Sequence, residues 1–332
     1  MKAKSFLLGM LVLGLGVSFV GEAWARNLYS LGTASTAGTY YILGAGFSSH
    51  INKRCPQVKI TAEITAGTLE NYYLVKRKKM DFGMVSPDIP IADLLEKKHG
   101  GQAKEKLRSF IWSWHTSDYH WIVRKKSPLK DLCDIKGKAV GVGPMGTSGM
   151  LQALVQIQAA CGYEPGKDYK ALYYPYAESQ NAIKDDTIDM GNTVAGTPVA
   201  SVVELARSVD IRLISLTQEQ QKKCLDSNPT LVPVTIPAGV YRGVDSDVRT
   251  TGGATGIVCR VDIPEEDAYA IVKAFFTDMK ERNKFHPQAE KYNLQAMVEV
   301  GQLLTRQGLP YHPGVVRYLK EVGAWRPELE VK

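Results

Sequence analysis

The sequence of 332 residues is 44% hydrophobic and 23% charged, which is ordinary for a globular protein and excludes disordered and fibrous classes. Its formal net charge is +7, and the basic residues are scattered over predicted helix faces rather than gathered in one patch. The composition therefore gives no support for a nucleic-acid partner, and the excess charge favours anionic solutes or an anionic membrane surface.

The first 25 residues predict export from the cytoplasm. Lys2 and Lys4 precede an apolar run at residues 5–20, and the A-W-A sequence that ends at Ala25 fits the cleavage pattern of a signal peptide. A membrane anchor is the alternative, but a run of about 16 residues is shorter than the ~20 that cross a bilayer. We expect cleavage after Ala25 and a periplasmic mature protein that is free of the membrane.

A strand, a loop of small residues and an apolar helix follow one another twice along the chain. The first copy places them at residues 28–32, 33–38 and 39–52, and the second at 139–143, 144–149 and 150–160. Each loop directs a helix N-terminus, with its unpaired N–H groups and positive dipole end, beyond the carboxyl edge of the strand. The repetition predicts two lobes that close on a small ligand.

Strands and helices alternate through the first two-thirds of the chain, which predicts an α/β fold with a mostly parallel sheet and helices on both faces. Further strands are expected at 58–64, 81–85, 107–114, 119–124, 169–173, 187–192 and 210–214, and further helices at 69–78, 89–98 and 217–226. After Pro233 the pattern changes to extended segments at 234–241 and 252–261, followed by helices from Glu265 onward.

This change of pattern predicts that the chain returns to its first lobe. We expect residues 26–123 to form the first part of lobe 1, residues 124–234 to form lobe 2, and residues 235–332 to complete lobe 1 with C-terminal helices. The two crossings, near Arg124 and Val234, predict a two-segment hinge.

Motifs for catalysis, nucleotides and metals receive little support. Residues 141–146 read G-V-G-P-M-G, which matches the G-x-G-x-x-G motif of dinucleotide-binding sites. In such sites the next strand ends in an acidic residue, but here the strand expected at 169–173 leads into Tyr174-Pro175-Tyr176. His115 and His120 flank Ser117-Asp118, where a cross-strand turn with packed aromatic residues is favoured over a His/Asp site. We predict no catalytic residues, no metal and no cofactor.

Five cysteines follow the cleavage site, so at least one thiol lacks a partner within the chain. They are Cys55, Cys133, Cys161, Cys224 and Cys259. Cys133 and Cys161 fall in one predicted lobe and could pair in an oxidising compartment, but the sequence does not show whether their Cα atoms come close enough. The sequence alone therefore leaves the pairing of Cys133 with Cys161 undecided.

A series of short motifs extends along nearly the whole mature chain, and all of them match the same family. They lie at residues 32–41, 62–71, 81–85 with Asp88, 123–125 with Ser127, 135–138, 143–149, 194–196 with Pro198, 235–241 and 312–314. Together they resemble the TAXI family, the solute-binding proteins of TRAP transporters. The resemblance implies a type II periplasmic-binding-protein fold, a cleft for a small organic acid or amino acid, and delivery to a sodium-driven TRAP permease.

The ligand classes that the resemblance implies are glutamate, dicarboxylates and 2-oxoacids. This chain departs from the family at several cleft positions. Ala34, Ser35 and Ala37 stand where members often have glycine, and Thr197 stands where they often have histidine. The ligand itself therefore cannot be carried over from the family.

The loops expected to face the cleft contain no Lys or Arg, so a bound anion would be held by hydroxyls, one amide, backbone N–H groups and helix dipoles. The predicted ligand-binding residues are Thr36, Tyr40, Thr68, Asn71 and Ser86 from lobe 1 and Thr147, Ser148 and Thr193 from lobe 2. For Thr147 and Ser148, helix capping alone is an equal alternative. Asp88 either receives a ligand amine or caps the helix that follows it.

Two other functions stay open. A ligand-sensing protein coupled to a membrane receptor would have the same cleft. A secreted hydrolase would need a nucleophile and a base that the sequence does not show. We expect a monomer that binds one small anionic solute.

Overall fold

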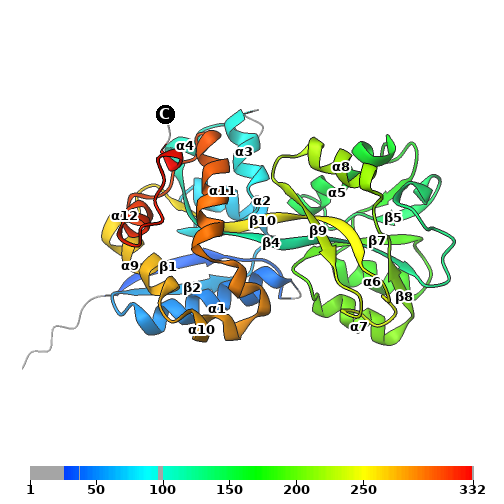
Figure 1. The fold of residues 1–332 in the computed structure, drawn as a ribbon, viewed down its shortest axis with the longest axis horizontal. Coiled ribbons are helices and arrows are strands. Elements are labelled where there is room, and N and C mark those ends of the chain that lie inside the picture. The colour runs from blue at the N-terminus through cyan, green and yellow to red at the C-terminus, as the bar shows by residue number, and fades with distance from the viewer. Residues whose placement is uncertain (1–25, 37, 96–99, 331–332) are drawn as a thin grey trace, which may run out of the picture.

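The computed structural model describes residues 26–36, 38–95 and 100–330. The predicted signal peptide lies outside the described residues. The described chain forms two α/β lobes joined by long strands (Figure 1). Ten strands form one sheet, in the order β2-β1-β3-β10-β4-β7-β5-β6, with β8 paired to β4 and β9 paired to β10. No helix among the described residues is long and apolar enough to cross a membrane.

Lobe 1 combines the N-terminal and C-terminal parts of the chain. Its parallel strands are β1 (Asn27–Gly32), β2 (Val58–Glu63) and β3 (Phe82–Val85). Its helices are α1 (Thr39–Arg54), α2 (Thr68–Lys76), α3 (Asp88–Leu95), α4 (Ala103–Lys106), α9 (Glu265–Phe276), α10 (Met279–Arg282), α11 (Leu294–Arg306) and α12 (Pro313–Glu321), with short turns η2 (Asn283–Phe285), η3 (Pro287–Lys291) and η4 (Pro327–Leu329). The expected return to lobe 1 places these last helices beside the N-terminal strands (Figure 1).

Lobe 2 repeats the alternation of strand and helix. Its strands are β5 (Ala139–Gly141), β6 (Lys170–Leu172), β7 (Met190–Ala195), β8 (Ile211–Leu213) and β9 (Leu231–Ile236), and its helices are α5 (Ser148–Cys161), α6 (Tyr176–Lys184), α7 (Ala200–Ser208) and α8 (Gln218–Ser227), with the turn η1 (Leu132–Ile135). The strands β6, β5 and β7 are parallel neighbours. The alternation predicted a mostly parallel sheet, but the sheet is mixed, because β4 and β10 pair with their neighbours in the antiparallel direction.

Two long antiparallel strands, β4 (Leu107–Arg124) and β10 (Val248–Arg260), run through both lobes (Figure 1). The predicted turn between strands at 107–114 and 119–124 is wrong, because β4 is continuous. Asp118 lies opposite Gly252 of β10 and Ala195 of β7, so the backbone at the expected turn is paired on both sides. Extended pairing satisfies backbone groups that a buried turn would leave unpaired.

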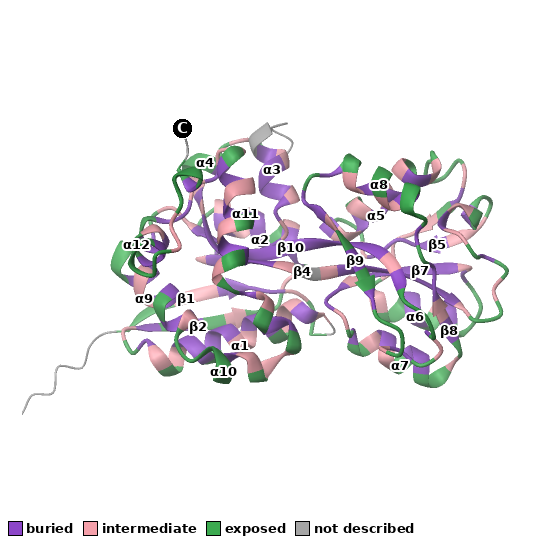
Figure 2. Cartoon of the chain, viewed as in Figure 1, coloured by how far each residue is buried: buried purple, intermediate pink, exposed green. Residues whose placement is uncertain are grey.

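Buried residues lie along the central strands β4 and β10 (Figure 2). The buried hydrophobic residues form three clusters. The largest, in lobe 1, combines residues of 31–112 with residues of 254–329. Trp121 and Ile122 of β4 belong to two different clusters of lobe 2, because adjacent strand residues face opposite sides of a sheet. Ile236 and Val248 also pack in lobe 2. The passages between the lobes therefore lie nearer to the middle of β4 and the start of β10 than to Arg124 and Val234.

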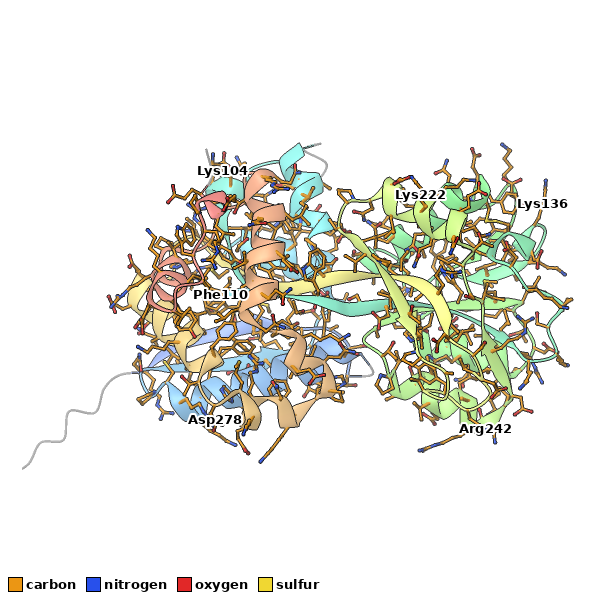
Figure 3. The ribbon with its side chains drawn as sticks, in the orientation of Figure 1. Lys104, Phe110, Lys136, Lys222, Arg242 and Asp278 are labelled. Carbon is orange, nitrogen blue, oxygen red and sulfur yellow. A yellow bond between two sulfur atoms is a disulfide. The ribbon has the colours of Figure 1, made fainter. Side chains whose placement is uncertain are left out.

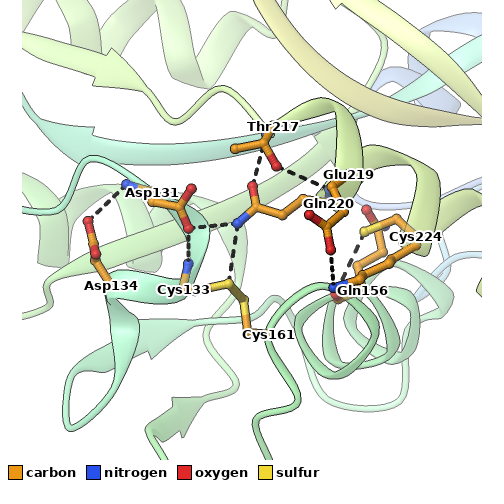
Figure 4. Close-up of a disulfide and its surroundings, with 10 residues drawn as sticks. Asp131, Cys133, Asp134, Gln156, Cys161, Thr217, Glu219, Gln220 and Cys224 are labelled. Atoms are coloured by element: carbon orange, nitrogen blue, oxygen red, sulfur yellow. Dashed lines mark hydrogen bonds and ion pairs between the residues drawn. A yellow bond between two sulfur atoms is a disulfide. The ribbon is translucent and has the colours of Figure 1, made fainter.

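Cys133 and Cys161 form a disulfide, with their Cα atoms 5.3 Å apart (Figure 4). It ties the turn η1 to the last residue of α5. Gln220 of α8 donates a hydrogen bond to Asp131, 2.6 Å away, and its amide nitrogen lies 3.3 Å from the Cys133 sulfur. Cys55, Cys224 and Cys259 are buried free thiols. Cys259 is one of the buried residues of the lobe 1 cluster.

Candidate functional site

A cavity of about 460 Å³ lies between the lobes. Lobe 1 contributes lining residues from segments 34–40, 65–68 and 86–88, lobe 2 from 144–152, 175–177 and 194–195, and the chain between the lobes from 117–119, 230–231 and 253–254. The cavity is large enough for a small organic molecule, since ligand pockets in proteins begin near roughly 300 Å³. Both lobes and the joining strands enclose the same space.

Helix N-termini surround this cavity. Its lining residues include the first residues of α1, α2, α3, α5 and α6. The N-caps of α1, α2 and α6 are Gly38, Gly67 and Pro175, and none of these three provides a side-chain hydrogen bond to its helix. Each uncapped end therefore presents free N–H groups and about half a positive charge to the space between the lobes. An anion in the cavity would meet several such ends at once.

Two glycines of these loops are required by geometry. Gly67 has φ of 103°, a conformation that residues with a Cβ rarely adopt. A Cβ on Gly149 would lie 2.8 Å from the Tyr176 hydroxyl and 3.3 Å from Val194. The small residue at 149 thus lets the start of α5 approach α6 and β7, which brings three segments of lobe 2 to the cavity wall.

Three tyrosines are among the described residues that line the cavity. Tyr40 starts α1, Tyr119 lies on β4 and Tyr176 starts α6. Burial raises the pKa of Tyr40 and of Tyr119 well above 10, and raises that of Tyr176 to about 12. All three hydroxyls therefore stay protonated and uncharged near neutral pH.

A hydrogen-bond network centred on Asp88 joins the lobes across the cavity. The Ser148 hydroxyl donates to Asp88 Oδ2 at 2.8 Å, and the Gln152 amide donates to the same oxygen at 3.0 Å. The Ser86 hydroxyl donates to Asp88 Oδ1. The Asn228 amide, near the passage back to lobe 1, donates to the side-chain oxygen Oε1 of Gln152 at 2.7 Å. Asp88 thus contacts lobe 2 directly, and its carboxylate faces the cavity.

A second contact between the lobes lies at Gln288 of η3. Its amide donates to the Thr197 carbonyl at 2.6 Å, and its side-chain oxygen is buried and has no hydrogen-bond partner. A Cβ on Gly196 would come within 2.7 Å of the Gln288 side chain. With the Asp88 network, this contact holds the lobes together at two separate places.

Five of the eight predicted ligand-binding residues line the cavity. Tyr40, Thr68 and Ser86 do so from lobe 1, and Thr147 and Ser148 from lobe 2. The Thr147 hydroxyl caps α5 by accepting from the Met150 N–H at 3.2 Å and donates to the Pro144 carbonyl at 2.8 Å. Capping therefore occupies Thr147, as the alternative interpretation held. Ser148 contacts the other lobe instead.

The other three predicted residues do not line the cavity. Asn71 is fully buried, and its amide donates to the Thr33 and Met84 carbonyls and accepts from the Thr65 hydroxyl. Its hydrogen-bonding groups tie the segments of lobe 1 together, so the prediction of Asn71 as a ligand donor is corrected. Thr36 is exposed in its loop, and Thr193 is buried near Gln180. The prediction misplaced these because strand residues alternate in direction and loop residues carry no such pattern.

The structure adds residues that the sequence reasoning missed. Ser117 and Tyr119 line the cavity from β4, and a turn was expected at Ser117. Gln152, one turn into α5, reaches Asp88. Tyr176 follows a third strand, β6, through a short loop at Pro175, and this recurrence of strand, loop and helix was a signal that could have found it.

The part of the chain that the structure describes offers no metal site. No group of three or more His, Cys, Asp or Glu side chains there is placed to hold a metal ion. His120 Nδ1 donates to the carbonyls of Asp118 and Thr193, and its Nε2 accepts from the Tyr241 hydroxyl. The ring is therefore held by backbone and by tyrosine, and burial lowers its pKa.

Basic side chains lie away from the cavity. None of the described lining residues is Lys or Arg. Figure 3 shows Lys104, Lys136, Lys222 and Arg242 at the outer surface of the two lobes. The charged side chain among the described lining residues is acidic Asp88.

Two lobes joined by long strands around a central cavity define the α/β fold of periplasmic solute-binding proteins. The crystal structure of the periplasmic aliphatic sulphonate binding protein SsuA from Escherichia coli has 18% sequence identity with this chain, covers 93% of it and 82% of that protein, and has a TM-score of 0.50. The periplasmic sulfonate-binding protein SsuA from Methylobacillus flagellatus has 17% identity, with 90% and 96% covered and a TM-score of 0.50. At these identities the likeness defines the fold.

The profile of the NMT1-like family matches residues 31–323. That range includes every element from the end of β1 to the end of α12. The chain belongs to the NMT1-like family.

Proposed function

We propose that this chain is an extracytoplasmic solute-binding protein that captures a small organic acid or amino acid. The observation that carries the proposal is the cavity of about 460 Å³ between the lobes, lined by the N-termini of five helices and by no described Lys or Arg. Such a site holds a carboxylate through N–H groups, hydroxyls and helix dipoles. The alternative of a secreted hydrolase lacks an activated nucleophile among the described lining residues.

The proposed site consists of residues that reach the cavity. We propose that Tyr40, Tyr119 and Tyr176, together with the N-termini of α1, α2 and α6, contact the ligand. Thr68 and Ser86 support them, because the Thr68 hydroxyl oxygen lies 3.5 Å from the Tyr40 hydroxyl and accepts from the Ser86 N–H at 3.3 Å.

We further propose that the protein delivers its ligand to a sodium-driven TRAP permease, and that the signal peptide is removed after Ala25. The support for the permease is the resemblance of the chain's motifs to the TAXI family. The ligand classes to be tested first are glutamate, dicarboxylates and 2-oxoacids. Aliphatic sulfonates join them, because the similar sulphonate-binding proteins bind another singly charged oxyanion in the same fold.

Native mass spectrometry of gently purified protein tests the proposal, since it shows a small molecule that remains in the cavity. A thermal-shift screen of the same solutes follows, on protein refolded to remove any endogenous ligand. At ~1,000 times its dissociation constant, a ligand that binds only the folded state adds about 4 kcal/mol to stability. A screen with no stabilising solute, and no co-purified molecule, would refute a solute-binding role.

A further inference from the structure

Charge in the cavity is distributed unevenly, and this bears on the ligand. The helix N-termini of α1 and α2 in lobe 1, and of α6 in lobe 2, face the cavity without side-chain caps. Asp88 is the charged side chain among the described lining residues. A cavity of this kind offers positive ends to one part of a ligand and a full negative charge to another.

The Asp88 carboxylate has room for a further donor. Three neutral side chains donate to it: Ser86 to Oδ1, and Ser148 and Gln152 to Oδ2. A carboxylate has about four acceptor positions, so these three contacts leave about one free. All three donors are uncharged, and no Lys or Arg lies among the described residues that line the cavity. The carboxylate is thus held in place without a cationic partner among the described lining residues.

We infer that the ligand carries an amino group that contacts the Asp88 carboxylate, so that the protein selects amino acids over 2-oxoacids and dicarboxylates. This inference rests on the proposed function. In the bound state the ligand carboxylate meets the helix N-termini while its ammonium meets Asp88, and the opposite charges are matched. A ligand that places a second carboxylate near Asp88 meets a like charge at close range, which disfavours it.

The position of Asp88 also links binding of the ligand amine to the contact between the two lobes. The same oxygen that accepts from Ser148 and Gln152 joins lobe 1 to lobe 2. An ammonium beside Asp88 therefore binds where the two lobes meet. Asp88 thus has two roles: it binds the ligand amine and it joins the lobes. The two roles make different predictions and can be separated.

The experiment measures dissociation constants by titration calorimetry for matched pairs that differ in the amino group. The pairs are L-glutamate and 2-oxoglutarate, L-leucine and 4-methyl-2-oxopentanoate, and L-alanine and pyruvate, with succinate added as a plain dicarboxylate. Each is titrated into the wild-type protein, into Asp88→Asn and into Gln152→Leu. Asp88→Asn keeps the shape and most hydrogen-bonding capacity but removes the charge. Gln152→Leu removes one contact between the lobes and keeps the charge.

For at least one pair we expect the amino acid to bind wild type at least tenfold more tightly than its 2-oxoacid. Asp88→Asn should reduce that preference to less than threefold, and Gln152→Leu should weaken both members equally and leave the preference intact. Binding of 2-oxoacids or succinate as tightly as amino acids overturns the inference and leaves the proposed function standing. Equal weakening of both members by Asp88→Asn also overturns it. If no solute binds, the proposed function fails and the inference fails with it.

Discussion

Burial raises the pKa values of the cavity tyrosines, so their hydroxyls stay protonated and uncharged near neutral pH. Tyr40 is at the start of α1 and its hydroxyl lies 3.5 Å from Thr68, so it stands at the join between two helix N-termini. The residue was predicted from its place after a small-residue loop, and it lines the cavity.

Tyr40→Phe should weaken ligand binding. Removal of the hydroxyl leaves a buried ligand oxygen short of a donor, and we expect a loss of roughly 1–2 kcal/mol, about tenfold in the dissociation constant. Tyr41→Phe is the matched control, because Tyr41 follows on the same helix and does not line the cavity. Calorimetric titration of both variants with a solute from the thermal-shift screen makes the comparison. Equal affinities for the two variants would place the ligand elsewhere.

The Asn71 side chain stabilises lobe 1 and does not line the cavity. Its amide joins Thr33, Thr65 and Met84, which come from three different segments. Asn71→Ala leaves two buried carbonyl groups without that donor, so we expect the free energy of unfolding to fall by roughly 2–4 kcal/mol. Urea unfolding measures this, with exposed Thr36→Ala as the control. A variant as stable as wild type would contradict the structural role.

At the scale of elements, helix N-termini form much of the cavity wall. The helices α1, α2, α5 and α6 all begin at the cavity, and each follows a strand through a short loop. Their remote ends are anchored in different ways, for example by the disulfide at the end of α5. The site is therefore placed by the rigid elements of each lobe, which fixes the directions of the N–H groups before a ligand arrives.

A buried histidine at the start of α12 makes lobe 1 sensitive to acid. His312 Nδ1 accepts from the Gly314 N–H at 3.2 Å and its Nε2 donates to the Ile263 carbonyl at 2.9 Å, so the ring is neutral. Burial lowers the pKa of His312 to about 4 in the folded protein, from 6.5. The unfolded chain thus binds more protons between these values, and stability is lost as the pH falls from 6.5 toward 4.

We expect His312 to account for about 2–3 kcal/mol of the stability lost between pH 7.5 and 4.5, since one pKa unit corresponds to about 1.4 kcal/mol. His312→Asn keeps a good helix cap and cannot titrate in this range. Urea unfolding at both pH values compares the variant with wild type. The other buried histidines titrate in both proteins and cancel in the difference. An unchanged pH dependence in the variant would rule out this contribution.

At the scale of the molecule, the two lobes are in contact across the cavity. Asp88 with Ser148 and Gln288 with Thr197 join them at separate places, and β4 and β10 pass between them. The arrangement matches a closed state, in which a small number of hydrogen bonds outside the joining strands would break on opening. Hinge motion about two strands is a common means of closing around a ligand.

Addition of a ligand should therefore reduce the radius of gyration. Small-angle X-ray scattering of the stripped protein, before and after saturation with a solute from the screen, measures the change. The scattering curve of the liganded protein should match the curve calculated from this structure, and that of the stripped protein should be broader in its distance distribution. A solute that gives no thermal shift serves as the control. An unchanged curve at saturation would argue against closure.

Much of the fold follows from local patterns in the sequence. The alternation of strands and helices predicted the α/β architecture, and the small-residue loops predicted where α1 and α5 begin. The mistakes arose where distant segments decide the outcome. The residues from His115 to Asp118 have polar side chains typical of a turn, yet β10 and β7 pair with that stretch and extend it. Asn71 follows a glycine loop typical of ligand sites, yet it turns inward to Thr33 and Met84.

The sequence by itself determined the features that depend on neighbouring residues. These are the repeated succession of strand, loop and helix, the helix N-termini, and the absence of Lys and Arg from the loops that face the cavity. The tertiary structure alone decided which side chains reach the cavity and which partners they meet. Asp88 illustrates the reason. Two of its three donors, Ser148 and Gln152, lie 60 and 64 residues away on the other lobe. Local sequence sets the direction of a helix end, but contacts over such separations form only when both lobes have folded and closed.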